Sequence, residues 1–332
     1  MSDFRCRLLK WILLALMLGL YFFLPLNLST DDFSLDKSPI ELHSDAVTQE
    51  VSSHNQKLDN QKLDHTLYTF IILTKTIAEA FQDRDLLRRQ SWLSYNWTDE
   101  GIKRNHSALS WKHFFLVGIT LDKDVMEKVK QENSLYGDIL MSETFSFYSL
   151  QIYSIMWAFK YLADNYNTRF IIKIDDDSIV NVNLLNEHLL NLMSEGRDYF
   201  FYGGTWCFAR PVEREGKWRV SEDVFPALFY PPYCCGPGLV FSMDTVEELL
   251  RIWGSNHQPV VGLDDAQLGI MIYTSGKINV TEIAGASLGY KKGHDDAFML
   301  LAIRPLEKGA SLINNYMDTG VYGDEDVQMH GQ

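Results

Sequence analysis

Three consecutive aspartates, Asp175, Asp176 and Asp177, directly follow an apolar stretch at 170–174 that predicts a buried strand. In an extended segment the first and third of these side chains project to the same side. Two carboxylates placed there can bind a hard divalent cation and leave coordination positions open for a diphosphate. The alternative is a solvated turn or a helix N-cap. The position after a strand favours the metal site, because parallel sheets bind ligands beyond the carboxyl ends of their strands.

A second pair of acids, Asp264 and Asp265, begins a predicted helix at 264–274. Acidic residues at this place are common as helix N-terminal caps, and that reading stays open. As chemistry, one carboxylate that faces a ligand pocket can act as a general base on a hydroxyl group.

The stretch Tyr-Pro-Pro-Tyr-Cys-Cys-Gly-Pro-Gly at 230–238 predicts a rigid aromatic loop. Gly236 and Gly238 would let the backbone approach a ligand closely. Tyr233 could stack on a sugar ring, or it could belong to a structural turn. His294, in a short run with two lysines and two aspartates, could be a further metal ligand. A surface or structural role is the alternative for a single histidine.

The elements that must position these residues alternate between strands and helices, which predicts an α/β layer architecture with a mostly parallel sheet. Segment 205–237 breaks this alternation and predicts a long functional insertion. The tail after about residue 310 is rich in Gly and Asp and is expected to be loose. The predicted strands are 68–73, 113–118, 170–174 and 200–202, and the predicted helices are 84–92, 123–131, 147–162, 184–193, 243–253 and 264–274.

The N-terminus predicts a membrane anchor. An uncharged apolar run at 11–28 follows three basic residues and precedes several aspartates. Its length suits a bilayer span, and the charge asymmetry places the N-terminus in the cytosol. We therefore expect a cytosolic tail at 1–10, a signal-anchor helix at 11–28, a flexible lumenal stem at 29–66 and one catalytic domain at 67–332.

Composition agrees with this topology and excludes one class of partner. The net charge of −14 argues against nucleic acid, because binding phosphates needs clustered Lys and Arg. In an oxidising lumen Cys207 is expected to pair with Cys234 or Cys235. Acceptor triplets for N-glycosylation begin at Asn96, Asn105 and Asn279.

Four blocks of the sequence, in order between about 67 and 283, resemble the β-1,3-galactosyltransferase family (glycosyltransferase family 31, with fringe-like relatives). The blocks are Arg89–Trp92, the aspartate run from Lys173 to Asn181, the stretch from Lys217 to Ser242, and Asp264–Gly269. There are two departures. Residues 147–153 lack the Asn and Lys of the family pattern, and Asp264 stands where the family usually has Glu.

The resemblance implies a GT-A-type nucleotide-sugar-binding fold, a UDP-sugar donor, a Mn²⁺ ion and an inverting reaction. It implies that Asp177 is the principal metal ligand, with His294 near the place of the family's metal-binding histidine. Asp175 and Asp176 would contact the ribose or sugar of the donor, and Asp265 would be the catalytic base. The donor-binding set is completed by Thr74, Arg89 and Lys173, and the substrate-binding set by Tyr233, Gly236, Gly238 and Asp264.

The expected activity is therefore a metal-dependent hexosyl transfer from a UDP-sugar to a glycan acceptor on a glycoprotein or glycolipid, forming a β-1,3 linkage. Galactose is the first choice of sugar and N-acetylhexosamine the second. The expected location is the Golgi membrane, as a single-pass type II protein, and a homodimer is compatible with this plan. The alternative is a catalytically silent, membrane-tethered glycan-binding protein or chaperone of the same fold.

Overall fold

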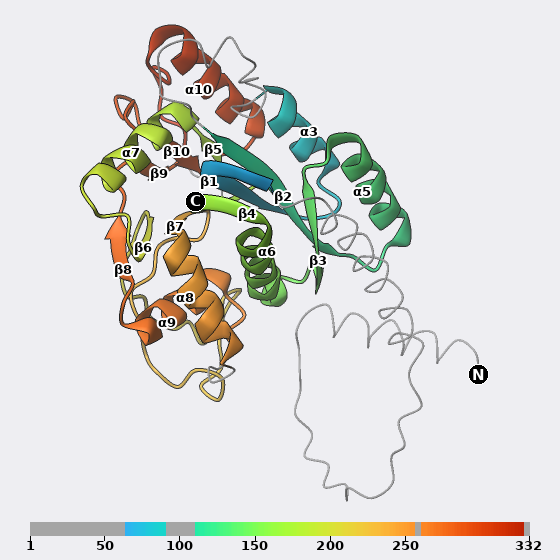
Figure 1. Cartoon of the computed structure of the whole chain (residues 1–332), viewed down its shortest axis with the longest axis vertical. Coiled ribbons are helices and arrows are strands. Elements are labelled where there is room, and N and C mark those ends of the chain that lie inside the picture. The colour runs from blue at the N-terminus through green and yellow to red at the C-terminus, as the bar shows by residue number, and fades with distance from the viewer. Residues whose placement is uncertain (1–63, 91–109, 256–259, 329–332) are drawn as a thin grey trace, which may run out of the picture. The chain divides into compact units, whose positions relative to one another are not determined.

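The computed structural model describes residues 64–90, 110–255 and 260–328 (Figure 1). At the centre lies a seven-stranded sheet in the order β3-β2-β1-β4-β7-β6-β8, in which β7 runs against its two neighbours and all other pairs are parallel. This confirms the predicted α/β class with a mostly parallel sheet. The strands are β1 (Asp64–Thr76), β2 (Trp111–Ile119), β3 (Ile139–Phe145), β4 (Tyr166–Asp175), β6 (Phe201–Gly204), β7 (Gly238–Ser242) and β8 (Asn279–Glu282).

The two central strands, β1 and β4, are apolar throughout their middle because both faces of the sheet are covered. Their parallel register pairs Phe70 with Phe170 and continues to Lys75 opposite Asp175. The carboxyl ends of β1 and β4 therefore lie level with each other, and the polar residues that follow both strands meet at one edge.

Helices cover both faces of the sheet, and side-chain alternation along the strands decides which face each residue meets. Figure 1 shows α6, α8 and α9 on one side and α7 and α10 on the other. Ile71 and Ile171 pack with the first group, and Ile72 and Ile172 pack in the cluster that includes α7 and α10. The helices are α3 (Phe81–Gln90), α5 (Lys123–Tyr136), α6 (Gln151–Asn165), α7 (Val182–Ser194), α8 (Met243–Gly254), α9 (Asp264–Ser275) and α10 (Leu306–Thr319), with a 3₁₀ turn η1 (Tyr148–Leu150) before α6.

A small second sheet ties the aspartate segment to the C-terminal part of the chain. Its order is β5-β10-β9, with β5 at Ile179–Val180, β9 at Ala286–Leu288 and β10 at Met299–Leu301. Because β5 follows the aspartate run by one residue, its pairing with β10 holds that run against residues more than a hundred positions later.

Of two features predicted for the C-terminal half, the helix at 264–274 is confirmed and the loose tail is not. The helix at 264–274 is present as α9 and ends at Gly276 in the left-handed conformation, as expected (φ 61°). The expectation of a loose tail after 310 is wrong, because α10 continues to Thr319 and buries Leu312 and Ile313. Six strands were not predicted: β3, β5, β7, β8, β9 and β10. Four of these, β5, β8, β9 and β10, have only two to four residues, too few to show a local pattern.

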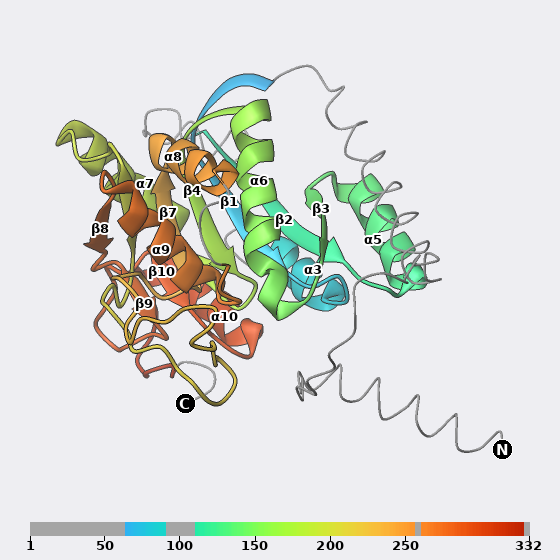
Figure 2. The same cartoon turned by 90° about the horizontal axis from the view of Figure 1, so that it is seen from below.

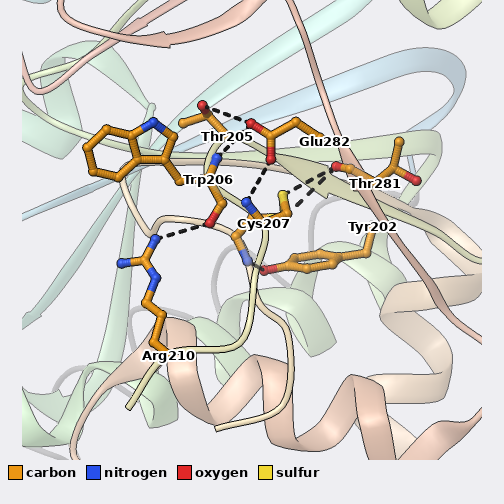
Figure 3. Close-up of a disulfide and its surroundings, with 8 residues drawn as sticks. Tyr202, Thr205, Trp206, Cys207, Arg210, Thr281 and Glu282 are labelled. Atoms are coloured by element: carbon orange, nitrogen blue, oxygen red, sulfur yellow. Dashed lines mark hydrogen bonds between the residues drawn. A yellow bond between two sulfur atoms is a disulfide. The ribbon is translucent and has the colours of Figure 1, made fainter. Parts of the chain in front are cut away.

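The irregular segment 205–237 contains the disulfide Cys207–Cys234 (Figure 3). The predicted pairing of Cys207 is thereby confirmed with Cys234, and Cys235 is a free thiol. The backbone N–H of Cys207 donates to Glu282 at 2.7 Å, and that of Cys234 donates to the Tyr202 hydroxyl at 3.1 Å. Figure 2 shows this segment, in yellow, looping beside α9.

The predicted tail at 1–10, the apolar run at 11–28 and the stem up to residue 63 lie outside the described residues, as do Asn96 and Asn105. Among the helices that the structure describes, none is long and apolar enough to span a bilayer. Asn279, the first residue of the edge strand β8, is exposed.

Candidate active site

The first acid of the aspartate run meets Lys75 from the neighbouring strand. The Lys75 ammonium lies 3.3 Å from Asp175 Oδ1 and 3.1 Å from Asp264 Oδ2. It also donates a hydrogen bond to Gln151 Oε1 at 2.9 Å. Lys75 therefore joins the ends of β1 and β4 to the first residues of α6 and α9.

Lys173, two residues before Asp175, is almost fully buried, with 1% of its side chain exposed. Its ammonium lies 2.8 Å from Asp175 Oδ1 and 3.6 Å from Asp264 Oδ2, and it donates to the Gly236 carbonyl at 2.6 Å. A buried ammonium group needs such partners to offset the loss of water. Lys75, Lys173, Asp175 and Asp264 together are called the lysine–aspartate cluster below.

The second acid of the run, which directly follows the last residue of β4, has partners other than the two lysines. Asp176 accepts hydrogen bonds from the Thr76 hydroxyl at 2.7 Å and from the Arg304 guanidinium at 2.9 Å. Arg304 also donates to Asp83 at 2.8 Å. A cavity of about 360 Å³ opens beside Asp83 and Arg304. Asp176 is therefore a bridge to residues near both ends of the folded unit.

The third acid, Asp177, carries charge that its surroundings do not neutralise. Burial and the neighbouring charges of Asp175 and Asp176 raise its pKa to about 6, although Arg304 opposes the shift. The Asp177 carbonyl accepts a hydrogen bond from the Ile303 N–H at 2.7 Å, which fixes its backbone. A carboxylate in this state gains from a bound cation, because the cation relieves the repulsion.

The two acids at the start of α9, Asp264 and Asp265, have pKa values shifted in opposite directions. Burial opposes the ionisation of Asp264, but Lys75 and Lys173 outweigh it and hold the pKa of Asp264 well below its usual range. Burial and the charge of Asp264 together raise the pKa of Asp265. Asp264 therefore remains an anion while its neighbour becomes the more basic carboxylate.

Gly236 lies directly against Asp265. A Cβ built on this glycine would stand 3.3 Å from Asp265 Oδ2, closer than most side-chain contacts. Its carbonyl is also the acceptor for Lys173. The predicted close approach at Gly236 is therefore an approach to the acid pair.

Two other residues of the predicted loop have packing roles in the structure. A Cβ on Gly238 would come within 2.5 Å of Leu301 Cδ2. Tyr233 is 5% exposed, and its Cβ occupies the space in front of Gly269. The prediction that both residues bind substrate is not tested by these contacts.

Two residues predicted to contact the nucleotide have other partners in the structure. Thr74 is fully buried, and its hydroxyl lies 2.8 Å from His113 Nε2. Arg89 is largely exposed on α3 and pairs with Asp85 of the same helix. The arginines of this helix that pair with residues outside it are Arg84, which is buried, and Arg88. The predicted roles of Thr74 and Arg89 remain predictions.

In the described part of the chain no three His, Cys, Asp or Glu side chains are placed to hold a metal ion. His294 lines a cavity of about 450 Å³, together with Trp206, Tyr290, Lys291 and Asp326. Hard carboxylate oxygens at 175–177 suit Mn²⁺ or Mg²⁺ in kind, and the repulsion at Asp177 favours a cation there.

Lys75, Thr76, Gln151 and Arg304 were missed by sequence reasoning. Lys75 and Thr76 could have been found, because they end an apolar strand next to the strand that carries the aspartates. Arg304 carried no such signal, since it lies 128 positions from Asp176.

The sequence profile of a family described as galactosyltransferase matches residues 82–282, which is more than half of the chain. The chain belongs to this galactosyltransferase family. The matched part contains both acid groups, while Lys75, His294 and Arg304 lie outside it. The expectation of a glycosyltransferase is thereby confirmed at the level of the galactosyltransferase family.

Individual relatives agree with the family. Beta-1,3-galactosyltransferase 5 of Pan troglodytes is 28% identical over 208 residues, covering 61% of this chain and 65% of that protein. The same protein of Homo sapiens is 28% identical, with 62% of it covered. Beta-1,3-galactosyltransferase 1 of Mus musculus is 25% identical over 219 residues, covering 65% of this chain and 63% of that protein. The match thus spans somewhat less than two thirds of each relative.

Proposed function

We propose that this chain is an inverting, metal-dependent hexosyltransferase with a GT-A-type fold. It transfers galactose, or as second choice an N-acetylhexosamine, from a UDP-sugar to a hydroxyl of a glycan acceptor and forms a β-1,3 linkage. The names of its relatives support galactose and this linkage. Family membership supports the nucleotide-sugar donor and the glycan acceptor.

The observation that carries the proposal is the opposite pKa shift of the two acids at the start of α9. Asp265 is partly buried, lies against Gly236 and has a raised pKa. The adjacent Asp264 is held as an anion by two lysines that also bind Asp175. A carboxylate that is more basic than usual, beside the strand ends that bind ligands in such sheets, suits general-base catalysis on a hydroxyl.

In the proposed reaction the acceptor hydroxyl gives its proton to Asp265 as its oxygen bonds to the anomeric carbon. The bond from that carbon to the diphosphate oxygen breaks, and its electron pair leaves with UDP. One displacement inverts the configuration and needs no covalent intermediate with the protein. Asp264 keeps its charge throughout, so the carboxyl of Asp265 takes the proton.

Asp177 is the residue we assign to the Mn²⁺ ion, with Asp175 and Asp176 contacting the ribose or sugar of the donor. When bound, the ion would act as a Lewis acid on the diphosphate. The unrelieved repulsion at Asp177 supports this assignment. His294 stays a proposed ligand.

The proposed location rests on the charge and hydrophobicity of the N-terminal sequence. We propose that residues 11–28 anchor the protein in the Golgi membrane as a single-pass type II protein with a lumenal catalytic domain. Protease treatment of sealed vesicles tests this topology. Protection of the catalytic domain is expected, and its digestion would contradict the orientation.

The activity is tested by UDP release from a panel of UDP-sugars with glycan acceptors. We expect release with UDP-galactose, loss of release with a chelator and recovery with Mn²⁺. Release that persists in the chelator would refute the metal dependence. No release with any donor would favour a catalytically silent glycan-binding protein.

A further inference from the structure

Two large aromatic side chains, one of them in the 3₁₀ turn before α6, stand exposed on the surface. Tyr148 of η1 is 47% exposed, and Trp218 of the irregular segment is 46% exposed. After burial, the charge of Asp264 is the largest cause that raises the pKa of Tyr148, and Asp265 adds to it. The phenol oxygen therefore lies within electrostatic range of both carboxylates.

One ammonium group, that of Lys217, lies beside both rings. The Lys217 ammonium lies 5.7 Å from the centre of the Tyr148 ring and 5.4 Å from that of the Trp218 ring. These contacts orient both rings without covering them.

The pair is also anchored to the acids. Gly262, two residues before Asp264, packs on Ser149, where an added Cβ would stand 3.2 Å from the Ser149 Cβ. Gln151 accepts a hydrogen bond from Lys75, and the same ammonium group lies 3.1 Å from Asp264. The turn that carries Tyr148 therefore has a defined position relative to Asp265.

Such an arrangement suits a sugar ring better than other ligands. A pyranose has an apolar face of C–H groups that packs on an aromatic ring, and a rim of hydroxyls that needs polar partners. A carboxylate such as Asp265 can accept a hydrogen bond from one of these hydroxyls and would repel an acidic sugar.

We propose that Tyr148 and Trp218 form the subsite for the acceptor sugar, a neutral pyranose that stacks on these rings with one hydroxyl directed at Asp265. This rests on the proposed transferase function. Tyr148 lies in 147–153, a segment that lacks the Asn and Lys of the family pattern. The subsite bears on which acceptor the enzyme selects.

The test is steady-state kinetics on the whole chain with Tyr148→Ala and Trp218→Ala, varying acceptor and UDP-sugar separately. We expect the KM for the acceptor to rise about tenfold, because a lost aromatic contact is worth roughly that factor. The KM for the donor keeps its wild-type value. Tyr148→Phe retains the ring and is expected to stay within about twofold of the wild type.

The matched control is Tyr273→Ala, which removes a tyrosine that is 74% exposed on α9. It is expected to leave the KM of both substrates unchanged. Acceptor kinetics of the Tyr148 and Trp218 variants equal to this control would overturn the subsite. A donor KM that rises with the acceptor KM would assign the rings to the donor instead and would also overturn it.

Failure of the transferase function is distinguishable from failure of the subsite. Saturation-transfer NMR with neutral and sialylated glycans measures binding without turnover. The wild type is expected to bind the neutral glycans, and Tyr148→Ala to lose that signal while Tyr148→Phe keeps it. If no donor releases UDP, the NMR comparison still decides the subsite, and equal signals in all variants would refute it.

Discussion

At the scale of single residues, two lysines set the chemistry of the carboxylates. Lys75 and Lys173 both approach Asp175 and Asp264, with distances between 2.8 and 3.6 Å. Their charges keep Asp264 ionised despite burial, and ionised Asp264 in turn makes Asp265 more basic. The difference between Asp264, which stays an anion, and Asp265, the proposed base, thus originates in the two lysines.

Replacing Lys75 by methionine keeps the volume of the side chain and removes its charge. The change leaves the charges of Asp175 and Asp264, whose side chains are 27% and 8% exposed, with one cation fewer to neutralise them. We therefore expect a loss of about 3 kcal/mol in the free energy of unfolding. Urea denaturation measures this. Lys160→Met, whose exposed ammonium pairs with Asp164, is the control and should change stability by less than about 0.5 kcal/mol. Equal effects of the two variants would contradict the account.

At the scale of elements, the alternation of side chains along β1 and β4 sorts the acidic site. Lys75, Lys173 and Asp175 face α6 and α9, while Asp176 has other partners, Thr76 and Arg304. The start of α9 is pressed onto the aromatic loop through Gly269, where an added Cβ would stand 2.5 Å from the Tyr233 Cβ. Close helix–loop packing therefore sets the position of Asp265.

Gly269→Ala should destabilise the protein even though alanine favours a helix. Neither Cβ can move without its backbone, so we expect a loss of about 1–3 kcal/mol in the free energy of unfolding. Gly254→Ala at the end of α8 meets no atom within 4 Å and serves as the control, expected to be neutral or stabilising. Thermal denaturation of both variants measures the difference. A Gly269→Ala protein as stable as the wild type would refute the tight contact.

The contact between α8 and the C-terminal end of α9 predicts a pH dependence of stability. Glu248 accepts hydrogen bonds from Arg251, Ser275 and Lys277, and these lower its pKa to about 2. Its unfolded pKa is about 4.3, so the stabilisation is complete above that pH and is lost as pH falls towards 2. Because both cations are largely exposed, we expect about 1 kcal/mol.

Glu248→Gln checks this by chemical denaturation between pH 2 and pH 7. The variant should be less stable than the wild type at neutral pH, and the difference should shrink as Glu248 of the wild type becomes protonated. A difference that stays constant over this range would show that the charge of Glu248 is not its source.

The sequence predicted correctly those elements that a local pattern marks, and did not predict those that depend on contacts between distant segments. Apolar runs predicted β1, β2 and β4, and the acids were placed correctly at the ends of β4 and the start of α9. The short strands β5, β9 and β10 are defined only by their partners, so no local period marks them. The tail was read as loose from its Gly and Asp content, although the apolar face of α10 packs on the core.

At the scale of the whole molecule, the site is closed by residues from both ends of the folded unit. Arg304, just before α10, donates a hydrogen bond to Asp83 of α3. It donates another to Asp176, which directly follows β4. β10 pairs with β5 directly after the aspartates. Such contacts depend on the complete fold, which explains why the sequence revealed the acids but not the cations that hold them.

The central claim is that Asp265 is the base of a sugar transfer, and Asp265→Asn tests it most directly. Transfer from UDP-galactose to a glycan acceptor is measured beside UDP binding by calorimetry, with Asp124→Asn at the exposed start of α5 as control. We expect the transfer rate to fall about a thousandfold while UDP binds as it does to the wild type. Near-normal transfer by Asp265→Asn would contradict the account.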